Sequence, residues 1–238
     1  MKLSYSSISK YESCPFAWKL RYVDKVPQAP KHYFSFGKAV HSALERMYEG
    51  EECPPLEEVL EAFRGAWSDA GYKDAKAVEK AKALGVGMLT DHHRAHAVGW
   101  AKPFATELKF DMVVDHVRVT GFIDRVDLLP DGTAHVLDYK TGRELEQGRI
   151  EEDPQLTMYQ IAVEEMYGLK VGKLTLFHVP TNTPQSCGRH SDQLADAWRA
   201  RIKATADAIA AQKFAPRPTE DACKWCDHKA LCPAWGAK

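Results

Sequence analysis

From Phe104 onward, hydrophobic and polar residues alternate along three consecutive stretches of the chain. These stretches are TELKFDMVVD (106–115), HVRVTGFIDRVDLL (116–129) and AHVLDYKT (134–141). Because successive side chains of a β-strand point to opposite faces of a sheet, a period of two predicts three consecutive antiparallel strands. A further strand is predicted at KLTLFHV, residues 173–179.

The rest of the chain has the helical period. Apolar residues at helical spacing predict an N-terminal helical arm at 6–23, which Pro15 interrupts, and several helices within 34–98. Two more helices are predicted, from about Pro154 to Tyr167 and from about Asp192 to Lys213. The fold class is therefore α/β. We expect one domain, 1–238, made of an arm (1–33), a helical region (34–103), a core (104–182) and a C-terminal helix with a cysteine cluster (183–238).

Composition adds few constraints. The 238 residues are 45% hydrophobic, enough to bury a sizeable core. The net charge of -1 gives no global attraction to nucleic acid, so it neither supports nor excludes DNA binding. No stretch approaches the roughly 18 apolar residues of a membrane span, and the N-terminus has no apolar signal segment. We expect a cytoplasmic protein without membrane partners.

The sequence PDG at 130–132 predicts the turn between the second and third strands. It fits a three-residue loop in which Gly132 takes the left-handed conformation and Leu129 pairs with Thr133. Counting back from that pair, Asp124 faces Asp138. A two-residue loop would instead place Asp124 opposite Tyr139.

In the first register Asp124, Asp138 and Lys140 share one face of the sheet. Two facing carboxylates repel each other unless a proton or a cation lies between them. Oxygen ligands suit Mg²⁺ or Mn²⁺, and a lysine beside such an ion can orient a water and screen a phosphate. This arrangement serves phosphodiester hydrolysis. The alternative is a surface hairpin whose ion pairs contribute less than about 1 kcal/mol.

Six cysteines in a chain without a signal segment argue for a metal site or for inert thiols. Four of them form a C-x2-C-x5-C pattern with one distant partner: Cys14, Cys223, Cys226 and Cys232. Such a set can hold a zinc ion or a [4Fe–4S] cluster, and the five-residue gap favours the cluster. We expect Cys53 before two prolines and Cys187 in the loop NTPQSCG to be ordinary thiols.

The segments GFIDRVD and VLDYKTG resemble the core of the PD-(D/E)XK nuclease superfamily, in its RecB-like branch. FGKAVHSALE (36–45) resembles the G-x-x-x-H element of this branch, and QLTMYQ (155–160) its Q-x-x-x-Y element. CPFAW and the C-terminal cysteines are similar to the iron–sulfur members, which include the AddB nuclease domain and CRISPR-associated adaptation nucleases. The resemblance implies a central mixed sheet flanked by helices, with an iron–sulfur region joining the two termini.

The resemblance also implies residue roles. His41, Asp124 and Asp138 would bind the metal, together with the backbone carbonyl of Tyr139, and Lys140 would serve the attacking water. The first acidic motif lacks the proline of the superfamily name, as is common in the RecB-like branch.

Gln155 and Tyr159, one helical turn apart, would help hold the substrate strand. The implied partners are DNA, single-stranded or with free ends, and a helicase or a CRISPR integrase. Glu107, a carboxylate at a strand start, is left without a role.

Two further segments offer alternatives. Lys19, Arg21 and Lys25, interleaved with Trp18 and Tyr22, could contact phosphates and stack on bases, or their helix could simply pack its aromatic side chains in the core.

The segment DHHRAH places His92 and His96 at i and i+4, a spacing that can bind zinc. No third ligand is evident, so we expect a solvated helical face.

Two functions of different classes remain. The first is a metal-dependent DNA exonuclease stabilised by a [4Fe–4S] cluster, acting in DNA recombination and repair, in CRISPR adaptation or in phage DNA metabolism. The second is a non-catalytic subunit that binds DNA ends within a helicase–nuclease or spacer-acquisition complex. The complete set of His41, Asp124, Asp138 and Lys140 favours the enzyme.

Overall fold

The computed structural model describes residues 1–143, 148 and 150–235, which form two compact units. The terminal unit consists of Met1–Ala29, Asp111–Gly121 and the described residues from Asp192 onward. The central unit consists of Pro30–Phe110 and the described part of Phe122–Ser191. The single domain expected from the sequence stays a prediction.

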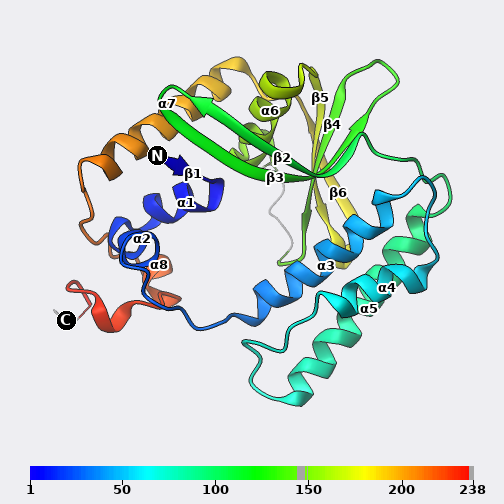
Figure 1. Ribbon diagram of the computed structural model, residues 1–238, viewed down its shortest axis with the longest axis horizontal. Coiled ribbons are helices and arrows are strands. Elements are labelled where there is room, and N and C mark those ends of the chain that lie inside the picture. The colour runs from blue at the N-terminus through cyan, green and yellow to red at the C-terminus, as the bar shows by residue number, and fades with distance from the viewer. Residues whose placement is uncertain (144–147, 149, 236–238) are drawn as a thin grey trace. The chain divides into compact units, whose positions relative to one another are not determined.

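The described residues form six strands. They are β1 (Lys2–Leu3), β2 (Ala105–Val114), β3 (Val117–Leu128), β4 (Ala134–Lys140), β5 (Val171–His178) and β6 (Thr183–Gly188). In the central unit the order is β3-β4-β5-β6, in which β4 and β5 are parallel and the outer pairs are antiparallel (Figure 1). β2 pairs with β3, and β1 pairs in parallel with the beginning of β3 in the terminal unit. The predicted α/β fold with a mixed central sheet is confirmed.

Eight α-helices are described. They are α1 (Tyr5–Ser13), α2 (Pro15–Tyr22), α3 (His32–Glu49), α4 (Leu56–Gly65), α5 (Ala75–His96), α6 (Pro154–Tyr167), α7 (Asp192–Ala210) and α8 (Glu220–Lys224). Asp153 caps α6 by accepting from the backbone N–H groups of Gln155 and Leu156, and Gly168, at φ +65°, ends it. Pro15 starts α2, so the arm is interrupted where the sequence predicts. No described helix is both long and apolar enough to cross a membrane.

The turn between β3 and β4 has the predicted form. Gly132 has φ +81°, and the backbone N–H of Leu129 donates to the carbonyl of Thr133 at 2.8 Å. Arg125 pairs with Leu137 and Val126 with Val136, which is the register of the three-residue loop. The same side chains therefore face the same side of the sheet as the sequence predicts.

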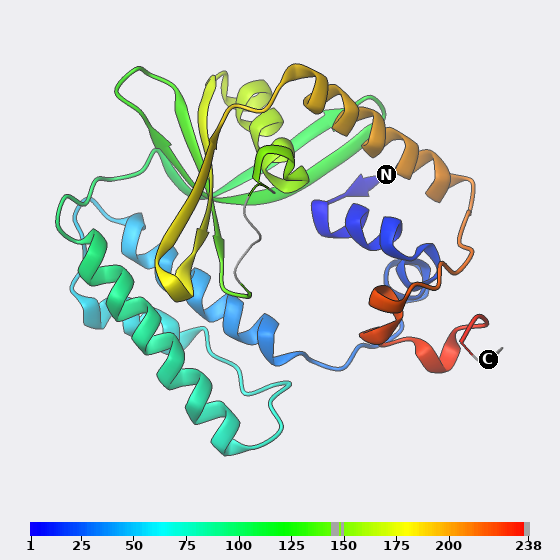
Figure 2. The same cartoon turned by 180° about the vertical axis from the view of Figure 1, so that it is seen from behind.

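The two faces of the central sheet carry different helices. Tyr139 and Phe177 lie in one buried apolar cluster with α3, α4 and α5, which run side by side in Figures 1 and 2. Lys140 lies next to Tyr139 and so points to the opposite face, where α6 packs on β4 and β5. The chemistry of the hairpin is thus held between a packed core and a helix.

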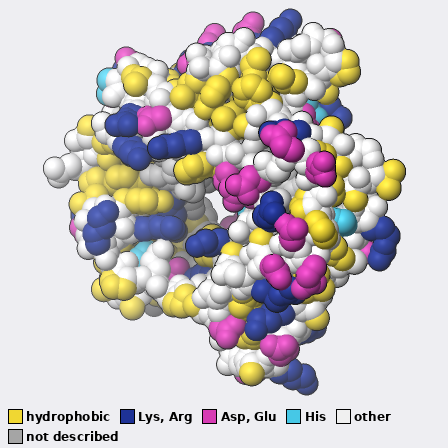
Figure 3. Space-filling view, turned by 45° about the vertical axis from the view of Figure 1, so that its right-hand side comes forward, with side chains coloured by type: hydrophobic (Ala, Val, Ile, Leu, Met, Phe, Trp, Pro, Cys, Tyr) yellow, Lys and Arg dark blue, Asp and Glu magenta, His cyan; other side chains and the backbone are white. Residues whose placement is uncertain are grey.

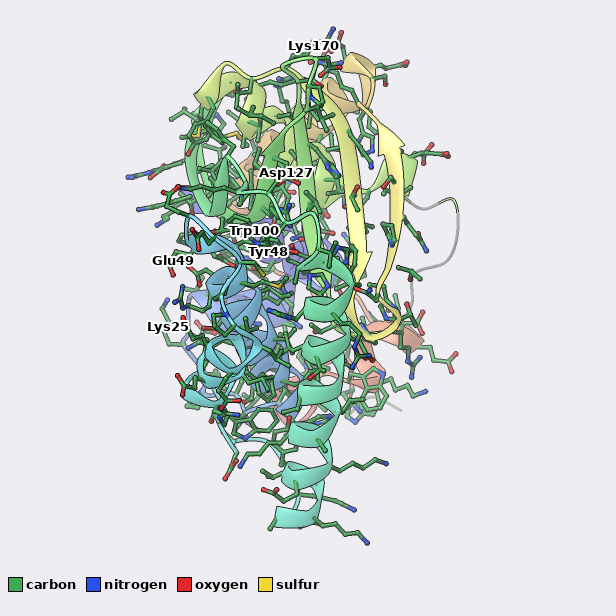
Figure 4. All side chains as sticks on the ribbon, turned by 90° about the vertical axis from the view of Figure 1, so that its right-hand side faces the viewer. Lys25, Tyr48, Glu49, Trp100, Asp127 and Lys170 are labelled. Atoms are coloured by element: carbon green, nitrogen blue, oxygen red, sulfur yellow. The ribbon has the colours of Figure 1, made fainter. Side chains whose placement is uncertain are left out.

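Tyr48 of α3 anchors the core side of this layer. Its ring stacks on Trp100 with centroids 6.4 Å apart, and Figure 4 shows both beside the strand that carries Asp127. The guanidinium of Arg125 lies 3.9 Å from the centre of the Tyr48 ring, and its Nε donates to Asp127 at 2.7 Å. A largely buried cation is thus held behind the hairpin by an aromatic ring and a carboxylate.

Two local predictions are wrong. The segment around Cys187 forms β6, an edge strand, where Pro184 is tolerated because an edge strand leaves some N–H groups unused. His92 is buried, not solvated, with Tyr48 Oη at 3.2 Å and Asn182 Oδ1 at 3.0 Å. These polar partners satisfy the ring nitrogens, and His96 shares Asn182.

In the terminal unit the N-terminal arm packs against the C-terminal segment. Trp18 is buried, stacks on Phe214 with ring centroids 5.8 Å apart and donates from Nε1 to Ser7. The hydroxyl of Tyr11 donates to the carbonyl of Lys213 at 2.6 Å. Trp18 is therefore a core residue, the second of the two alternatives from the sequence.

Candidate metal centre

His41, Glu107 and Asp124 come together in the central unit from three elements: α3, β2 and β3. One ligand atom of each lies within 4.8 Å of the other two. The Nδ1 atom of His41 is 3.4 Å from Oδ1 of Asp124. Gly37 allows this approach, because a Cβ atom there would lie 3.3 Å from Oγ1 of Thr141 at the end of β4.

Asp138 and Lys140 lie beside this group on β4. The Nζ atom of Lys140 is 2.5 Å from Oδ2 of Asp138, and Asp138 is buried. Asp124 reaches the same strand, since its Oδ2 accepts from the backbone N–H of Tyr139 at 2.7 Å. The structure therefore joins the two halves of the hairpin through these side chains.

Lys140 is also held from α6. Its Nζ donates to Oε1 of Gln155 at 2.9 Å, and Nε2 of Gln155 donates to the hydroxyl of Tyr159 at 2.7 Å. Gln155 and Tyr159 are adjacent, as their spacing predicts. Tyr159 is only 5% exposed, so its ring belongs to the core. Both groups of the Gln155 amide have partners inside the chain.

The acidic groups oppose their own ionisation. Burial, and then the charge of Asp124, raise the pKa of Asp138 to about 6, although Lys140 and His41 act in the other direction. Burial and Asp124 likewise raise the pKa of Glu107 to about 7. The carboxylates thus have the repulsion that the hairpin register predicts, and a cation would relieve it.

The cationic groups respond to the same charges. Burial lowers the pKa of His41, but the attraction of Asp124, Asp138 and Glu107 outweighs it and raises the pKa to about 9. Burial also opposes the charge of Lys140, yet Asp138 and Asp124 raise its pKa above the usual range. Without a metal, protons on His41 and Lys140 balance the carboxylates.

Glu107 is the member that sequence reasoning left without a role. It has φ +44°, a left-handed conformation that costs a non-glycine residue on the order of 1 kcal/mol. Its sequence signal was only a carboxylate at the start of a strand. The pairing of β2 with β3 brings it next to Asp124.

The donor set fits a hard divalent cation. Two carboxylates and one imidazole converge, with a third carboxylate on Asp138 nearby. Lysine and acidic side chains are also mixed on the face of the molecule in Figure 3, so no surface of a single charge covers it. Local groups, not global charge, would attract a polyanion.

The four predicted cluster cysteines lie in the terminal unit. Cys14, between α1 and α2, and Cys223, Cys226 and Cys232 line one cavity together with Lys10 and Arg217, among other residues. Four thiols around one cavity are a donor set that suits an iron–sulfur cluster or zinc. Cys53 and Cys187 belong to the central unit.

Comparisons with known proteins agree with the site. Residues 2–233 match the family described as "PD-(D/E)XK nuclease superfamily". A "Gene 69 protein" of Mycobacterium phage D29 is 29% identical over 98% of this chain and 96% of its own length. Its namesake in Mycobacterium phage L5 is 26% identical with the same coverage.

Two other similarities are partial or distant. One of the two subunits of an ATP-dependent helicase/deoxyribonuclease from Streptococcus agalactiae is 24% identical over 59% of this chain and 14% of its own length. A solved structure titled "Crystal structure of SSO0001" is 17% identical, with a TM-score of 0.39, and covers 96% of this chain and 95% of that chain.

Proposed function

Because this chain belongs to the PD-(D/E)XK nuclease superfamily, we propose that it is a metal-dependent exonuclease that hydrolyses phosphodiester bonds in single-stranded DNA or at DNA ends. The observation that carries the proposal is the convergence of His41, Glu107 and Asp124 beside the pair of Asp138 and Lys140. A purely structural hairpin has no use for buried carboxylates that repel one another.

His41, Asp124 and Asp138, with the carbonyl of Tyr139, are the proposed ligands of Mg²⁺ or Mn²⁺, and Glu107 joins them. Oxygen donors with one imidazole suit either ion. A divalent ion supplies Lewis-acid stabilisation to a phosphodiester that reacts with water.

Lys140 remains an ammonium group in this site, since Asp138 and Asp124 raise its pKa. It therefore acts as a fixed positive charge that orients the attacking water and offsets charge on the phosphate, and it does not act as the proton acceptor. Gln155, itself held by Tyr159, fixes the position of the ammonium group. The predicted contact of Gln155 and Tyr159 with the substrate strand stays a prediction.

Cys14, Cys223, Cys226 and Cys232 are the proposed ligands of a [4Fe–4S] cluster. The cavity that all four line supports this proposal. The ligands come from both ends of the chain, so the cluster would fasten the N-terminal arm to the C-terminal segment. Its role is structural, because the four cysteines belong to the terminal unit and the proposed metal ligands to the central unit.

The relatives that match over nearly their full length come from phages, which favours phage DNA metabolism over recombination and repair or CRISPR adaptation. The partial similarity to a helicase/deoxyribonuclease keeps a helicase among the proposed partners. The competing function is a non-catalytic subunit that binds DNA ends.

A degradation time course separates the two functions. Linear single- and double-stranded DNA, labelled at either end, is incubated with Mg²⁺ or Mn²⁺, with circular single-stranded DNA as the control for a free end. We expect progressive loss of linear DNA that stops with a chelator and is absent in Asp138→Asn. Binding of linear DNA without degradation under either metal would support the non-catalytic subunit instead, and cleavage of circles would contradict an exonuclease.

A further inference from the structure

Helix α3 exposes two aromatic side chains at the end from which it leads to His41. Tyr33 is 53% and Phe34 is 63% exposed, and their ring centroids are 4.6 Å apart. The apolar face of α3 is filled by other residues, among them Phe36 and Val40 in the core cluster. The two exposed rings thus lie outside the core that stabilises the helix.

Phe34 shares a line along α3 with Lys38 and His41. At 3.6 residues per turn, positions i, i+4 and i+7 fall within about 60° of one another around the helix. Phe34 lies about 10 Å along the axis from His41, which corresponds to roughly three stacked nucleotides. An aromatic ring, a cation and a proposed metal ligand therefore follow one another on one helix face.

Lys38 is exposed and has no ion-pair partner among the residues that the structure describes. Lys82 of α5, by contrast, pairs with Glu79 one turn away. An unpaired ammonium group between the aromatic pair and the metal centre is placed to contact a phosphate of a strand that runs toward the metal.

A second exposed ring lies on the other side of the hairpin chemistry, on β3. Phe122 is 53% exposed and precedes Asp124 by two residues, so both side chains point to the same face of the sheet. Two elements, a helix and a strand, each present an aromatic ring in register with a residue of the metal centre. Exposed aromatic rings with a neighbouring cation are the components of single-strand binding sites.

We propose that Phe34 and Lys38 form a binding subsite for the substrate strand, in which Phe34 stacks on an unpaired base and Lys38 contacts the adjoining phosphate. The inference rests on the proposed nuclease function and specifies its substrate as a strand with unpaired bases near the cleaved bond. Because every base has a π-face, the subsite tolerates any sequence.

Affinity for short fluorescein-labelled single strands tests the stacking contact, measured by anisotropy in the Asp138→Asn background with Mg²⁺ so that no strand is degraded. Stacking contributes about 1–3 kcal/mol per base, so Phe34→Ala should weaken binding about 5- to 150-fold. An abasic site moved along the strand should have one position at which Phe34→Ala no longer has an effect. Phe34→Trp should restore affinity.

Lys38→Met should lower the salt dependence of binding by about one ion, whereas Leu84→Ala, at an exposed apolar residue of α5, should change neither quantity. Equal weakening by Phe34→Ala for every abasic strand would overturn the subsite and indicate a structural role. No weakening would overturn it as well, and would leave the rings for a protein partner.

The result is distinguishable from failure of the nuclease proposal. If the unsubstituted protein binds DNA without degrading it, the exonuclease proposal fails while the coupling between Phe34 and the abasic position can still be measured. If it degrades DNA and the coupling is absent, only the subsite fails.

Discussion

Asp138→Asn separates the catalytic value of a buried carboxylate from its cost to the fold. The carboxyl of Asp138 is buried among Asp124, Lys140 and His41, and its pKa is raised from the usual 3.8 to about 6. One pKa unit corresponds to about 1.4 kcal/mol, so near neutral pH the ionised group destabilises the metal-free fold by about 2 to 3 kcal/mol. Asparagine keeps the shape and removes this charge.

The sign of the pH dependence follows from the raised pKa. A group whose pKa is higher in the folded chain favours the fold fully below about pH 4 and loses that contribution as the pH rises through 6. Metal-free Asp138→Asn should therefore be more stable than the unsubstituted protein by about 1–3 kcal/mol near pH 7.5, with a smaller gain near pH 4. Hydrolysis should be lost, because the variant lacks a metal ligand.

Urea unfolding in a chelator at both pH values measures the free energy, and end-labelled DNA measures activity. Asp131→Asn in the turn of the same hairpin is the matched control. Bonds from Thr133 lower the pKa of Asp131, so this variant should lose stability, not gain it, and keep its activity. A loss of more than about 2 kcal/mol in Asp138→Asn near pH 7.5, or full activity, would refute the reasoning.

Three further predictions concern the packing, the buried histidine and the cysteine cluster. In α5, Gly85→Ala should lower the free energy of unfolding by about 1–3 kcal/mol, because the new Cβ would lie 2.4 Å from the ring of Phe63, whereas Gly87→Ala, with nothing within 4 Å, should raise it by about 0.5–1 kcal/mol; equal effects in urea unfolding would contradict this account. Burial lowers the pKa of His92 to about 3, so the unfolded chain binds this proton first and stability falls as the pH drops from 6.5 toward 4.5; His92→Gln should weaken that dependence by about 2 kcal/mol over this range, and an unchanged pH profile would rule out the contribution. Protein purified without oxygen should be brown with about four irons per chain, and Cys14→Ala should lose the visible absorption; a colourless protein with one zinc ion would contradict the cluster.

Local sequence was sufficient for several elements. The alternation along 106–141 predicted β2, β3 and β4, and the PDG turn predicted the register. Pro154 and Gly168 bound α6, which agrees with the prediction at both ends. These features depend on neighbours a few residues apart, so the sequence carries them without knowledge of the fold.

The prediction failed where burial or pairing depends on distant residues. The segment around Cys187 has the polar composition of a loop, yet it forms β6 because β5 offers it a free edge. His92 has the charge pattern of a solvated helix, but the packing of α5 against the sheet buries it beside Asn182, 90 residues away. Sequence patterns report a residue's neighbours along the chain, and these outcomes were decided by neighbours in space.

The metal centre divides in the same way. The motifs of the sequence by themselves single out His41, Asp124, Asp138 and Lys140, because each motif is a short run with one spacing. Only the tertiary structure decides that Glu107 joins His41 and Asp124, and that Lys140 is held by Gln155 as well as by Asp138. The reason is electrostatic: burial and the summed charges of groups from α3, β2, β3, β4 and α6 determine which side chains carry a proton, and no single segment contains all of those charges.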